Sequence, residues 1–427
     1  MTERATVATR LADAVSTVLG VPETPWRLRA WDGSEAGPTD APVLVVRSPQ
    51  AVRRLVWAPG ELGLVRAYVA GEIDLEGDIF ATLEALSSSG RLSSRATFPR
   101  PSARDWLELG RTAAALHAVG APPAPPPGEF PRPRRIRRNR PDLDAAAIAH
   151  HYDVGNDFYA LVLGPTLVYS CAVWGDEDTG LDAAQVAKLD LVCRKLGLAP
   201  GMRLLDVGCG WGSLALHAAR EYGADVVGIT LSAEQAALAR QRIDQGGLAG
   251  RITIRIQDYR DVDDGPYDAI SSIGMAEHVG RVALGGYATT LHGLLRPGGR
   301  LLNHAISWAA GDTTWHDDTF IARYVFPDGE LLPLATTMAA LHDAGFEVLD
   351  VEALRRHYAL TLRAWVERLE KQWDAAVALT SEGRARVWRL YMAACALSFE
   401  AGKLGIEQLL VQRPGGEPPP LRRTEWI

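Results

Sequence analysis

Leu204-Leu205-Asp206-Val207-Gly208-Cys209-Gly210-Trp211-Gly212 joins a short apolar run to three glycines spaced G-x-G-x-G. An apolar run of this kind predicts a strand, and the glycines predict a tight turn leading into a helix. The N–H groups at the start of such a helix can face a bound ligand. The spacing differs from the G-x-G-x-x-G of dinucleotide-binding folds. Taken alone, the segment is also compatible with a turn that binds nothing.

The pattern that continues from this turn alternates short apolar runs with helical stretches. The predicted strands are 203–207, 225–230, 253–257, 267–273 and 300–305, and the predicted helices between them are 212–221 and 233–243. Strands that alternate with helices are typical of parallel sheets. We therefore expect an α/β fold of the Rossmann-like, doubly wound type with a mostly parallel sheet.

The first part of the chain predicts a smaller α+β domain at 1–118. Helices are expected at 10–19, 49–57 and 79–88, strands at 26–31 and 42–46, and a loop-rich stretch at 60–63 and 67–78 because of its glycines. A linker at 119–142 follows, rich in proline and then in arginine, with Arg132 to Arg140 its basic part. Proline-rich segments of this kind are stiff and extended. The remaining 143–427 would be the catalytic domain.

Composition excludes several classes of protein. The chain has 427 residues, a formal net charge of −7 and a hydrophobic fraction of 47%, which speaks against a dedicated nucleic-acid binder. Its four cysteines show no CxxC spacing and no nearby histidine pair, so neither a metal site nor a disulfide framework is expected. No apolar stretch approaches the roughly 18 residues needed to cross a bilayer, and the N-terminus does not read as a signal peptide. A reducing cytoplasm is the expected location.

Several short motifs occur in a fixed order around the glycine-rich turn. They are the segments 151–159, 169–172, 228–232, 274–280 and 357–362. Together they resemble the cyclopropane-fatty-acyl-phospholipid synthase family of class I S-adenosylmethionine-dependent methyltransferases, which includes the mycolic acid cyclopropane synthases. The resemblance extends from about residue 143 to the C-terminus. The segments 31–34 and 68–74 also look like parts of the accessory, lipid-binding domain of the phospholipid-acting members.

The resemblance implies a binding site for S-adenosylmethionine. The residues that correspond to cofactor-binding positions are Tyr152, Tyr169, Ser170, Asp206, Gly208, Gly210, Gly212, Thr230, Leu231, Ser232, Gln235, Gln257 and Asp258. Many class I enzymes place an acidic residue at the end of the second strand to hold the ribose. This chain has Thr230-Leu231-Ser232 there and Gln235 one helical turn later, so it is a variant of that pattern.

The resemblance also implies a bicarbonate ion that acts as a base. Its cradle would consist of Cys171, Glu277, His304, Ile306 and Tyr358. In this family the cis double bond of an acyl chain attacks the sulfonium methyl, and bicarbonate removes a proton from the resulting carbocation. Bicarbonate beside a carboxylate is repulsive unless one partner is protonated, so a perturbed pKa is expected. Without the motifs, His304 would be a satisfied strand-end histidine and Glu277 a helix-start acid.

Two products are compatible with this chemistry. Ring closure gives a cyclopropane acyl chain of a membrane phospholipid, and a prior hydride shift gives a 10-methylene chain, the precursor of a 10-methyl branched fatty acid. Ala276 stands where related bacterial synthases often have phenylalanine, and this smaller residue would reshape the pocket. A homodimer and a reductase partner are both consistent with the resemblance.

Three rival functions remain open at this point. A small-molecule O- or N-methyltransferase would share the glycine-rich turn without needing Glu277, His304 and Tyr358. A non-catalytic lipid binder would bind cofactor without turnover, and a nucleic-acid methyltransferase could use the arginines. A lipid substrate would require peripheral contact with the membrane surface, for which the basic linker is a candidate because each basic residue near an anionic surface contributes about 1 kcal/mol. A solvated tether is the alternative role of that linker.

Overall fold

The computed structural model describes residues 5–58, 60–88, 102–130, 154–309, 319–327 and 329–425. The chain forms two compact units. The first contains Met1–Arg132 together with two later segments, Asp317–Val325 and Thr380–Leu397, and the second contains the rest. The first unit is therefore assembled from three stretches of sequence, and its two later stretches could not be assigned to it from local patterns.

The first unit is built on a small four-stranded sheet of order β2-β1-β3-β4, in which β1 and β3 are parallel. Its core includes Leu28, Leu44 and Ile73 from the strands and Leu11 from the first helix. Its elements are α1 (Val7–Leu19), β1 (Arg27–Ala30), β2 (Glu35–Ala36), β3 (Val43–Val46), α2 (Pro49–Trp57), α3 (Glu61–Val69), β4 (Ile73–Glu76), α4 (Ile79–Ser88), α5 (Ala103–Ala115), α12 (Phe320–Tyr324) and most of α16 (Glu382–Glu400).

The loop-rich stretch predicted at 60–63 and 67–78 is wrong. The structure has helix α3 and strand β4 there. Gly63 lies inside α3, and a Cβ at this position would be 2.0 Å from the carbonyl oxygen of Ala58. The glycine is therefore present because two helices approach closely, and not because the chain is irregular.

A buried carboxylate ties three segments of the first unit together. The side chain of Glu129 is 1% exposed and accepts hydrogen bonds from Arg66 at 2.6 and 2.7 Å, from the Tyr324 hydroxyl at 2.9 Å and from Arg323. Burial acts to raise the pKa of Glu129, but these donors outweigh it and lower the pKa. The network joins α3, α12 and the end of the first segment, which are far apart in sequence.

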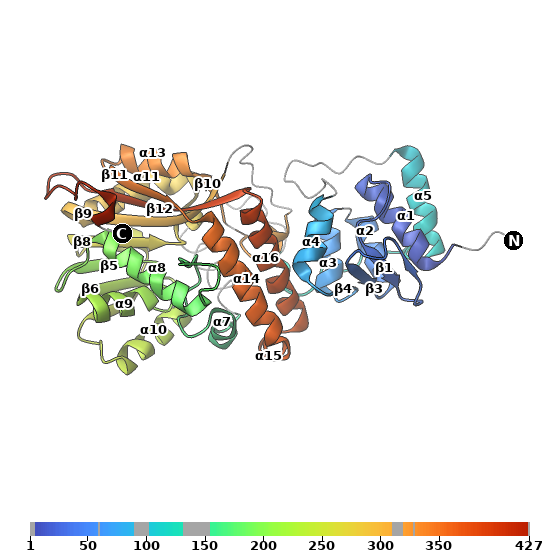
Figure 1. Cartoon of the computed structure of the whole chain (residues 1–427), viewed down its shortest axis with the longest axis horizontal. Coiled ribbons are helices and arrows are strands. Elements are labelled where there is room, and N and C mark those ends of the chain that lie inside the picture. The colour runs from blue at the N-terminus through green and yellow to red at the C-terminus, as the bar shows by residue number, and fades with distance from the viewer. Residues whose placement is uncertain are drawn as a thin grey trace. The chain divides into compact units, whose positions relative to one another are not determined.

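The second unit is a three-layer α/β structure. Its elements are α7 (Asn156–Leu163), α8 (Leu181–Leu196), β5 (Arg203–Val207), α9 (Ser213–Tyr222), β6 (Asp225–Thr230), α10 (Ala233–Gln245), β7 (Ile252–Ile256), η1 (Tyr259–Asp261), β8 (Tyr267–Ile273), α11 (Ala276–Leu294), β9 (Leu295–Trp308), β10 (Leu332–Pro333), α13 (Leu334–Asp343), β11 (Glu347–Ala353), α14 (Arg355–Lys371), α15 (Trp373–Leu379), β12 (Leu404–Gln412) and η2 (Arg423–Glu425). In Figure 1, α11 and α13 lie on one side of the sheet and α9 and α10 on the other.

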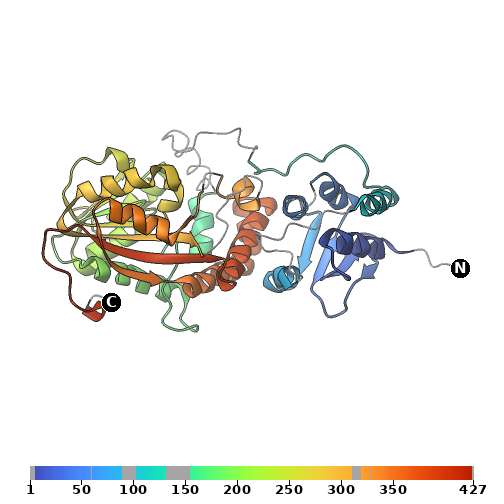
Figure 2. The same ribbon diagram turned by 90° about the horizontal axis from the view of Figure 1, so that it is seen from above.

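The large sheet has the order β11-β12-β9-β8-β5-β6-β7, with β10 beside β9. The strands from β9 to β7 are parallel, while β12 is antiparallel to both β9 and β11. Figure 2 shows β12 as the long red strand of this sheet. The expected doubly wound, mostly parallel sheet is confirmed, and the order reverses between β5 and β8, which creates a crevice at the carboxyl ends of these strands.

The two faces of this sheet have separate cores. One contains Leu204 and Val226 with side chains of α8, α9 and α10, and the other contains Leu205 and Ile270 with side chains of α11 and α13. The strands predicted at 225–230 and 267–273 match β6 and β8, and the strand predicted at 253–257 is displaced by one residue from β7. β9 is longer than the predicted 300–305, because its whole second half pairs with β12.

Candidate active site

The glycine-rich turn connects β5 to α9 with a backbone that requires glycine. Gly208, Gly210 and Gly212 have φ values of 76°, 54° and 76°, in the left-handed region that other residues seldom adopt. The N–H groups of Gly208 and Cys209 donate to the carbonyl of Ile229 at 3.0 and 2.9 Å. The turn is thereby fastened to the end of β6.

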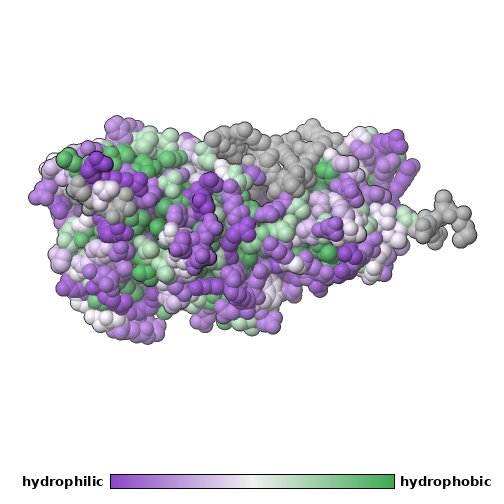
Figure 3. Space-filling view, in the orientation of Figure 1, coloured by the Kyte–Doolittle hydropathy of each residue, from purple (hydrophilic) through white to green (hydrophobic). Residues whose placement is uncertain are grey.

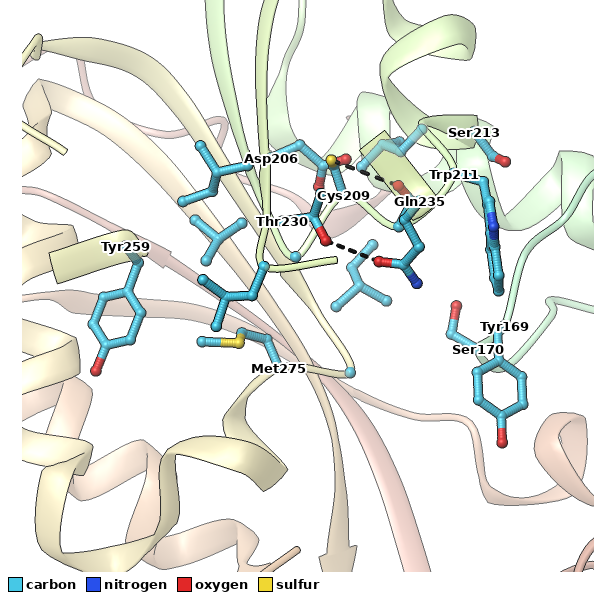
Figure 4. Close-up of a pocket in the computed structure, with 18 of the residues that line it drawn as sticks. Tyr169, Ser170, Asp206, Cys209, Trp211, Ser213, Thr230, Gln235, Tyr259 and Met275 are labelled. Atoms are coloured by element: carbon cyan, nitrogen blue, oxygen red, sulfur yellow. Dashed lines mark hydrogen bonds between the residues drawn. The ribbon is translucent and has the colours of Figure 1, made fainter. Parts of the chain in front are cut away.

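A cavity opens beside this turn, at the carboxyl ends of β5, β6, β7 and β8 (Figure 4). Of the predicted cofactor residues, those that line it are Tyr169, Ser170, Asp206, Gly208, Gly210, Thr230, Leu231, Gln235, Gln257 and Asp258. Ser232 instead caps α10, where its hydroxyl accepts from the Gln235 N–H. Gly212 lies behind the turn, where a Cβ would be 3.2 Å from that of Ala239. Tyr152 lies outside the described residues.

The end of β6 carries a buried polar pair in place of the acid that is absent there. The hydroxyl of Thr230 donates to Oε1 of Gln235 at 2.8 Å, and the Ser232 N–H donates to the same hydroxyl at 3.2 Å. Figure 4 shows both side chains at the cavity wall. Because Thr230 occupies the amide oxygen of Gln235, it fixes the orientation of that side chain and leaves the amide N–H₂ as donor.

Two carboxyl groups at the cavity differ in their surroundings. Burial raises the pKa of Asp206 to about 6, although Ser271 donates a hydrogen bond to it at 2.7 Å. Burial also acts on Asp258, but its ion pair with Arg260 at 2.6 Å lowers its pKa. The polar residues at the strand ends and the open backbone of the turn fit a ligand with an amino-acid part and a nucleoside part, as S-adenosylmethionine has.

The predicted cradle residues are connected through the protein backbone. The Cys171 thiol faces the carbonyl of Leu354 at 3.7 Å, and the same carbonyl accepts from the Tyr358 N–H at 3.1 Å. The Leu354 N–H donates to Ile406, which pairs with Ile306 across β12 and β9. The Ile306 N–H in turn donates to Oε1 of Glu277 at 2.8 Å. The structure thus brings together residues from five separate parts of the sequence.

Glu277 and His304 have buried polar atoms whose hydrogen-bonding capacity is not used by the described residues. Oε2 of Glu277 and both ring nitrogens of His304 find no hydrogen-bond partner among the described residues. Burial raises the pKa of Glu277 to about 7, although the Ile306 N–H lowers it. Burial and the positive charges of Lys188 and Lys195 lower the pKa of His304 well below its usual range. A neutral imidazole and a carboxyl that can hold a proton fit a bound oxyanion such as bicarbonate.

The Cys171 thiol is not suited to nucleophilic chemistry. Its side chain is fully buried, and burial raises the pKa of the thiol despite the nearby charge of Lys188. A thiolate is the reactive form of cysteine, so this environment favours an inert group.

The last predicted cradle residue, Tyr358, lies on α14 and is 6% exposed.

Aromatic rings form a continuous row between the cofactor cavity and the cradle. Tyr169, which lines the cavity, lies 5.4 Å from Trp365 between ring centroids, and Trp365 lies 6.0 Å from Tyr358. Phe399 follows at 4.8 Å from Tyr358. Aromatic faces attract cations and exclude water. The row therefore forms a largely buried aromatic wall that extends from the cofactor cavity to Tyr358.

The motifs did not single out two polar residues that lie at this site. Lys188 from α8 lines the cavity with its side chain 2% exposed. Gln408 on β12 is opposite His304, is fully buried, and has no partner for either amide atom among the described residues. Hydrophobic periodicity cannot show that a particular lysine or glutamine is buried, and only the tertiary structure reveals it.

The strand order, the glycine-rich turn at the point where that order reverses, and the cavity beside it define a class I S-adenosylmethionine-dependent methyltransferase. The sequence model of the family described as mycolic acid cyclopropane synthetase matches residues 139–409, and the chain belongs to this family. The class and family expected from the motifs are confirmed.

Three known proteins illustrate the similarity. The probable fatty acid methyltransferase of Mycobacterium tuberculosis is 42% identical over 424 residues, which cover 96% of this chain and 97% of the relative. Tuberculostearic acid methyltransferase of the same organism is 34% identical and covers 96% and 92%. The crystal structure of a mycolic acid cyclopropane synthase complexed with SAH and CTAB is 34% identical, with a TM-score of 0.60, and covers 63% of this chain and 98% of that one. Enzymes of this family transfer methyl groups to lipid acyl chains.

Proposed function

We propose that this enzyme methylates the cis double bond of an unsaturated phospholipid acyl chain and yields a cyclopropane ring after loss of a proton to bicarbonate. The observation that carries the proposal is that Glu277 and His304, which neighbour residues of the cofactor cavity along the chain and in the sheet respectively, have buried polar atoms without a hydrogen-bond partner among the described residues. A small-molecule methyltransferase or a lipid binder without activity would have no need for such an oxyanion site.

Different residues would bind the cofactor, orient the base and exclude water. S-adenosylmethionine supplies an electrophilic methyl carbon, and bicarbonate supplies the base. The glycine-rich turn, Thr230 and Gln235 would hold the cofactor, while Glu277 and His304 orient the base through hydrogen bonds. The aromatic row from Tyr169 to Tyr358 keeps water from the carbocation, which water would trap.

An exomethylene chain is the second candidate product. Two relatives with fatty acid methyltransferase names match almost the whole chain and not only the catalytic unit. Ala276, buried at the start of α11 directly before Glu277, leaves more room there than a phenylalanine would. A wider pocket would let the cation migrate by hydride shift before the proton leaves. In that case a reductase would act on the product.

Mass spectrometry of lipids would test both products. Purified protein is incubated with methyl-deuterated S-adenosylmethionine and vesicles of an oleoyl phospholipid. We expect acyl chains that keep all but one deuterium of the transferred methyl group, and oxidative cleavage of double bonds then distinguishes the methylene from the ring. Absence of label, with cofactor binding intact, would refute acyl methylation.

We further propose that the protein meets its substrate as a peripheral protein at the membrane surface from the cytoplasmic side. No helix within the described residues is long and apolar enough to cross a bilayer. The face shown in Figure 3 is largely hydrophilic, with hydrophobic side chains in small groups. Charge attraction between basic residues and an anionic surface would contribute to the binding. A homodimer could bind to the membrane surface in the same peripheral manner.

The basic linker Arg132–Arg140, which lies outside the described residues, should contribute to this binding. Reversing Arg134, Arg135, Arg137 and Arg138 to glutamate should weaken co-sedimentation with anionic vesicles by tenfold or more, because each basic residue contributes about 1 kcal/mol. Binding to zwitterionic vesicles serves as the control. Unchanged binding to anionic vesicles at low salt would show that the linker is only a tether.

A further inference from the structure

Lys188 is a buried ammonium group without a carboxylate partner among the described residues. Its side chain is 2% exposed, and its Nζ donates one hydrogen bond, to the Ser170 hydroxyl at 3.1 Å. An ammonium group has three N–H donors. No carboxylate oxygen of the described residues lies within ion-pair distance of it. Buried lysines are rarely left in this state, because an unpaired charge is costly away from water.

Lys195 on the same helix shows what a structural buried lysine looks like in this protein. It lies seven residues, or about two turns, after Lys188, and its side chain is fully buried. Its Nζ is 2.5 Å from Glu352 and 3.5 Å from Asp350. The fold therefore pairs Lys195 directly with two carboxylates, whereas Lys188 has no ion pair among the described residues and only the more distant carboxylate of Asp206 acts on it.

The surroundings of Lys188 are those of the active site. It lines the cofactor cavity together with Ser170 and Asp206. Ser170 precedes Cys171 of the cradle, and the positive charge of Lys188 acts on Cys171, Asp206 and His304. The charge of Lys195 also acts on His304. The carboxyl of Asp206 is engaged by Ser271 at 2.7 Å and is not within ion-pair distance of the ammonium. Burial lowers the pKa of Lys188 to about 8, so the group is still mostly charged at neutral pH.

We propose that Lys188 is a positioning residue whose positive charge balances the bicarbonate anion in the cradle. Its N–H donors that Ser170 does not use would be directed toward that anion or toward a group that binds the anion. This role rests on the proposed function. The cradle otherwise offers a neutral imidazole and a carboxyl that must hold a proton, and neither compensates a buried negative charge. The methionine part of the cofactor also carries a carboxylate. The experiment must therefore distinguish an interaction of Lys188 with bicarbonate from one with the cofactor carboxylate.

The test compares Lys188→Met with Lys195→Met, a matched loss of a buried positive charge from the same helix. The rate is measured against added bicarbonate in buffer freed of carbon dioxide, and cofactor affinity is measured by calorimetry. For Lys188→Met we expect the bicarbonate concentration at half-maximal rate to rise about tenfold or more, since the partner charge is removed from a buried pair. Because Lys188 also lines the cofactor cavity, cofactor affinity should weaken as well, but by a smaller factor than the bicarbonate dependence. Lys195→Met should lower the melting temperature and change the bicarbonate dependence less than Lys188→Met does, because Glu352 and Asp350 already neutralise the charge of Lys195.

A second variant separates charge from hydrogen bonding. Lys188→Gln keeps a donor toward Ser170 but carries no charge, and we expect it to resemble Lys188→Met in its bicarbonate dependence. Wild-type bicarbonate dependence in either folded variant would overturn the proposal. Weakened cofactor binding with unchanged bicarbonate dependence would assign Lys188 to the cofactor carboxylate instead. If the wild-type enzyme methylates lipid but ignores bicarbonate, the proposed base itself is wrong, and this result is distinct from the other two.

Discussion

Replacing Glu277 by alanine should lower the turnover number by about 10²- to 10³-fold, as loss of a key hydrogen-bonding group at a reacting centre typically does. Oε1 of this residue accepts from the Ile306 N–H, and Oε2 is buried without a partner among the described residues. The variant would lose the group that orients the base. Cofactor affinity should stay within about twofold, because Glu277 does not line the cofactor cavity. Lipid turnover by mass spectrometry and cofactor binding by calorimetry are the two measurements.

Glu277→Gln is the informative control for this prediction. Glutamine keeps an acceptor for Ile306 and supplies a permanent donor in place of the protonated oxygen. Burial raises the pKa of Glu277 to about 7, so the wild-type carboxyl holds its proton below that pH and loses it above. Wild-type activity should therefore decline as the pH rises from 6 to 8, while the glutamine variant should decline less. A glutamine variant as inactive as the alanine variant at every pH would mean that the ionised carboxylate is the working form.

Replacing Glu129 by alanine should lower the free energy of unfolding of the first unit by about 3–5 kcal/mol, the usual cost of breaking a buried ion pair. The change leaves Arg66 and Arg323 without their shared carboxylate, and Arg323 is only 7% exposed. Hydrogen exchange of α3 and α12 in the full chain measures the effect where it arises. Glu108→Ala, which removes an exposed pair with Arg104, should cost less than about 1 kcal/mol.

The same carboxylate predicts a dependence of stability on pH. The pKa of Glu129 is lower in the folded state than in the unfolded chain, so its stabilising effect is complete above the unfolded value of about 4.5. Stability should fall as the pH drops below that value and through the lowered folded pKa. The alanine variant should lack this component. Equal acid sensitivity in both proteins would show that the Glu129 network contributes no net stability.

Local patterns were sufficient for much of the fold. The alternation of apolar strands and helices predicted the parallel sheet, because a strand buried on both faces must be apolar along its length. The glycines at 208–212 predicted the tight turn, because only glycine adopts their backbone angles without strain, and the resemblance of the surrounding motifs predicted the cofactor. The loop-rich stretch expected at 60–63 and 67–78 was wrong. Gly63 allows close packing of helices, and a local pattern cannot distinguish such a glycine from one in a turn.

The sequence by itself thus determined the class of enzyme, the cofactor and the approximate positions of the crevice-forming strands along the chain, since these depend on short contiguous segments. The tertiary structure alone decided which distant residues meet. It placed Glu129 between α3 and α12, joined Glu277 to Ile306, buried Lys188 at the cofactor cavity and placed Gln408 opposite His304. Burial, ion pairing and pKa depend on neighbours brought together by folding, and a lysine that is solvated and one that is buried without a partner are the same letter in the sequence.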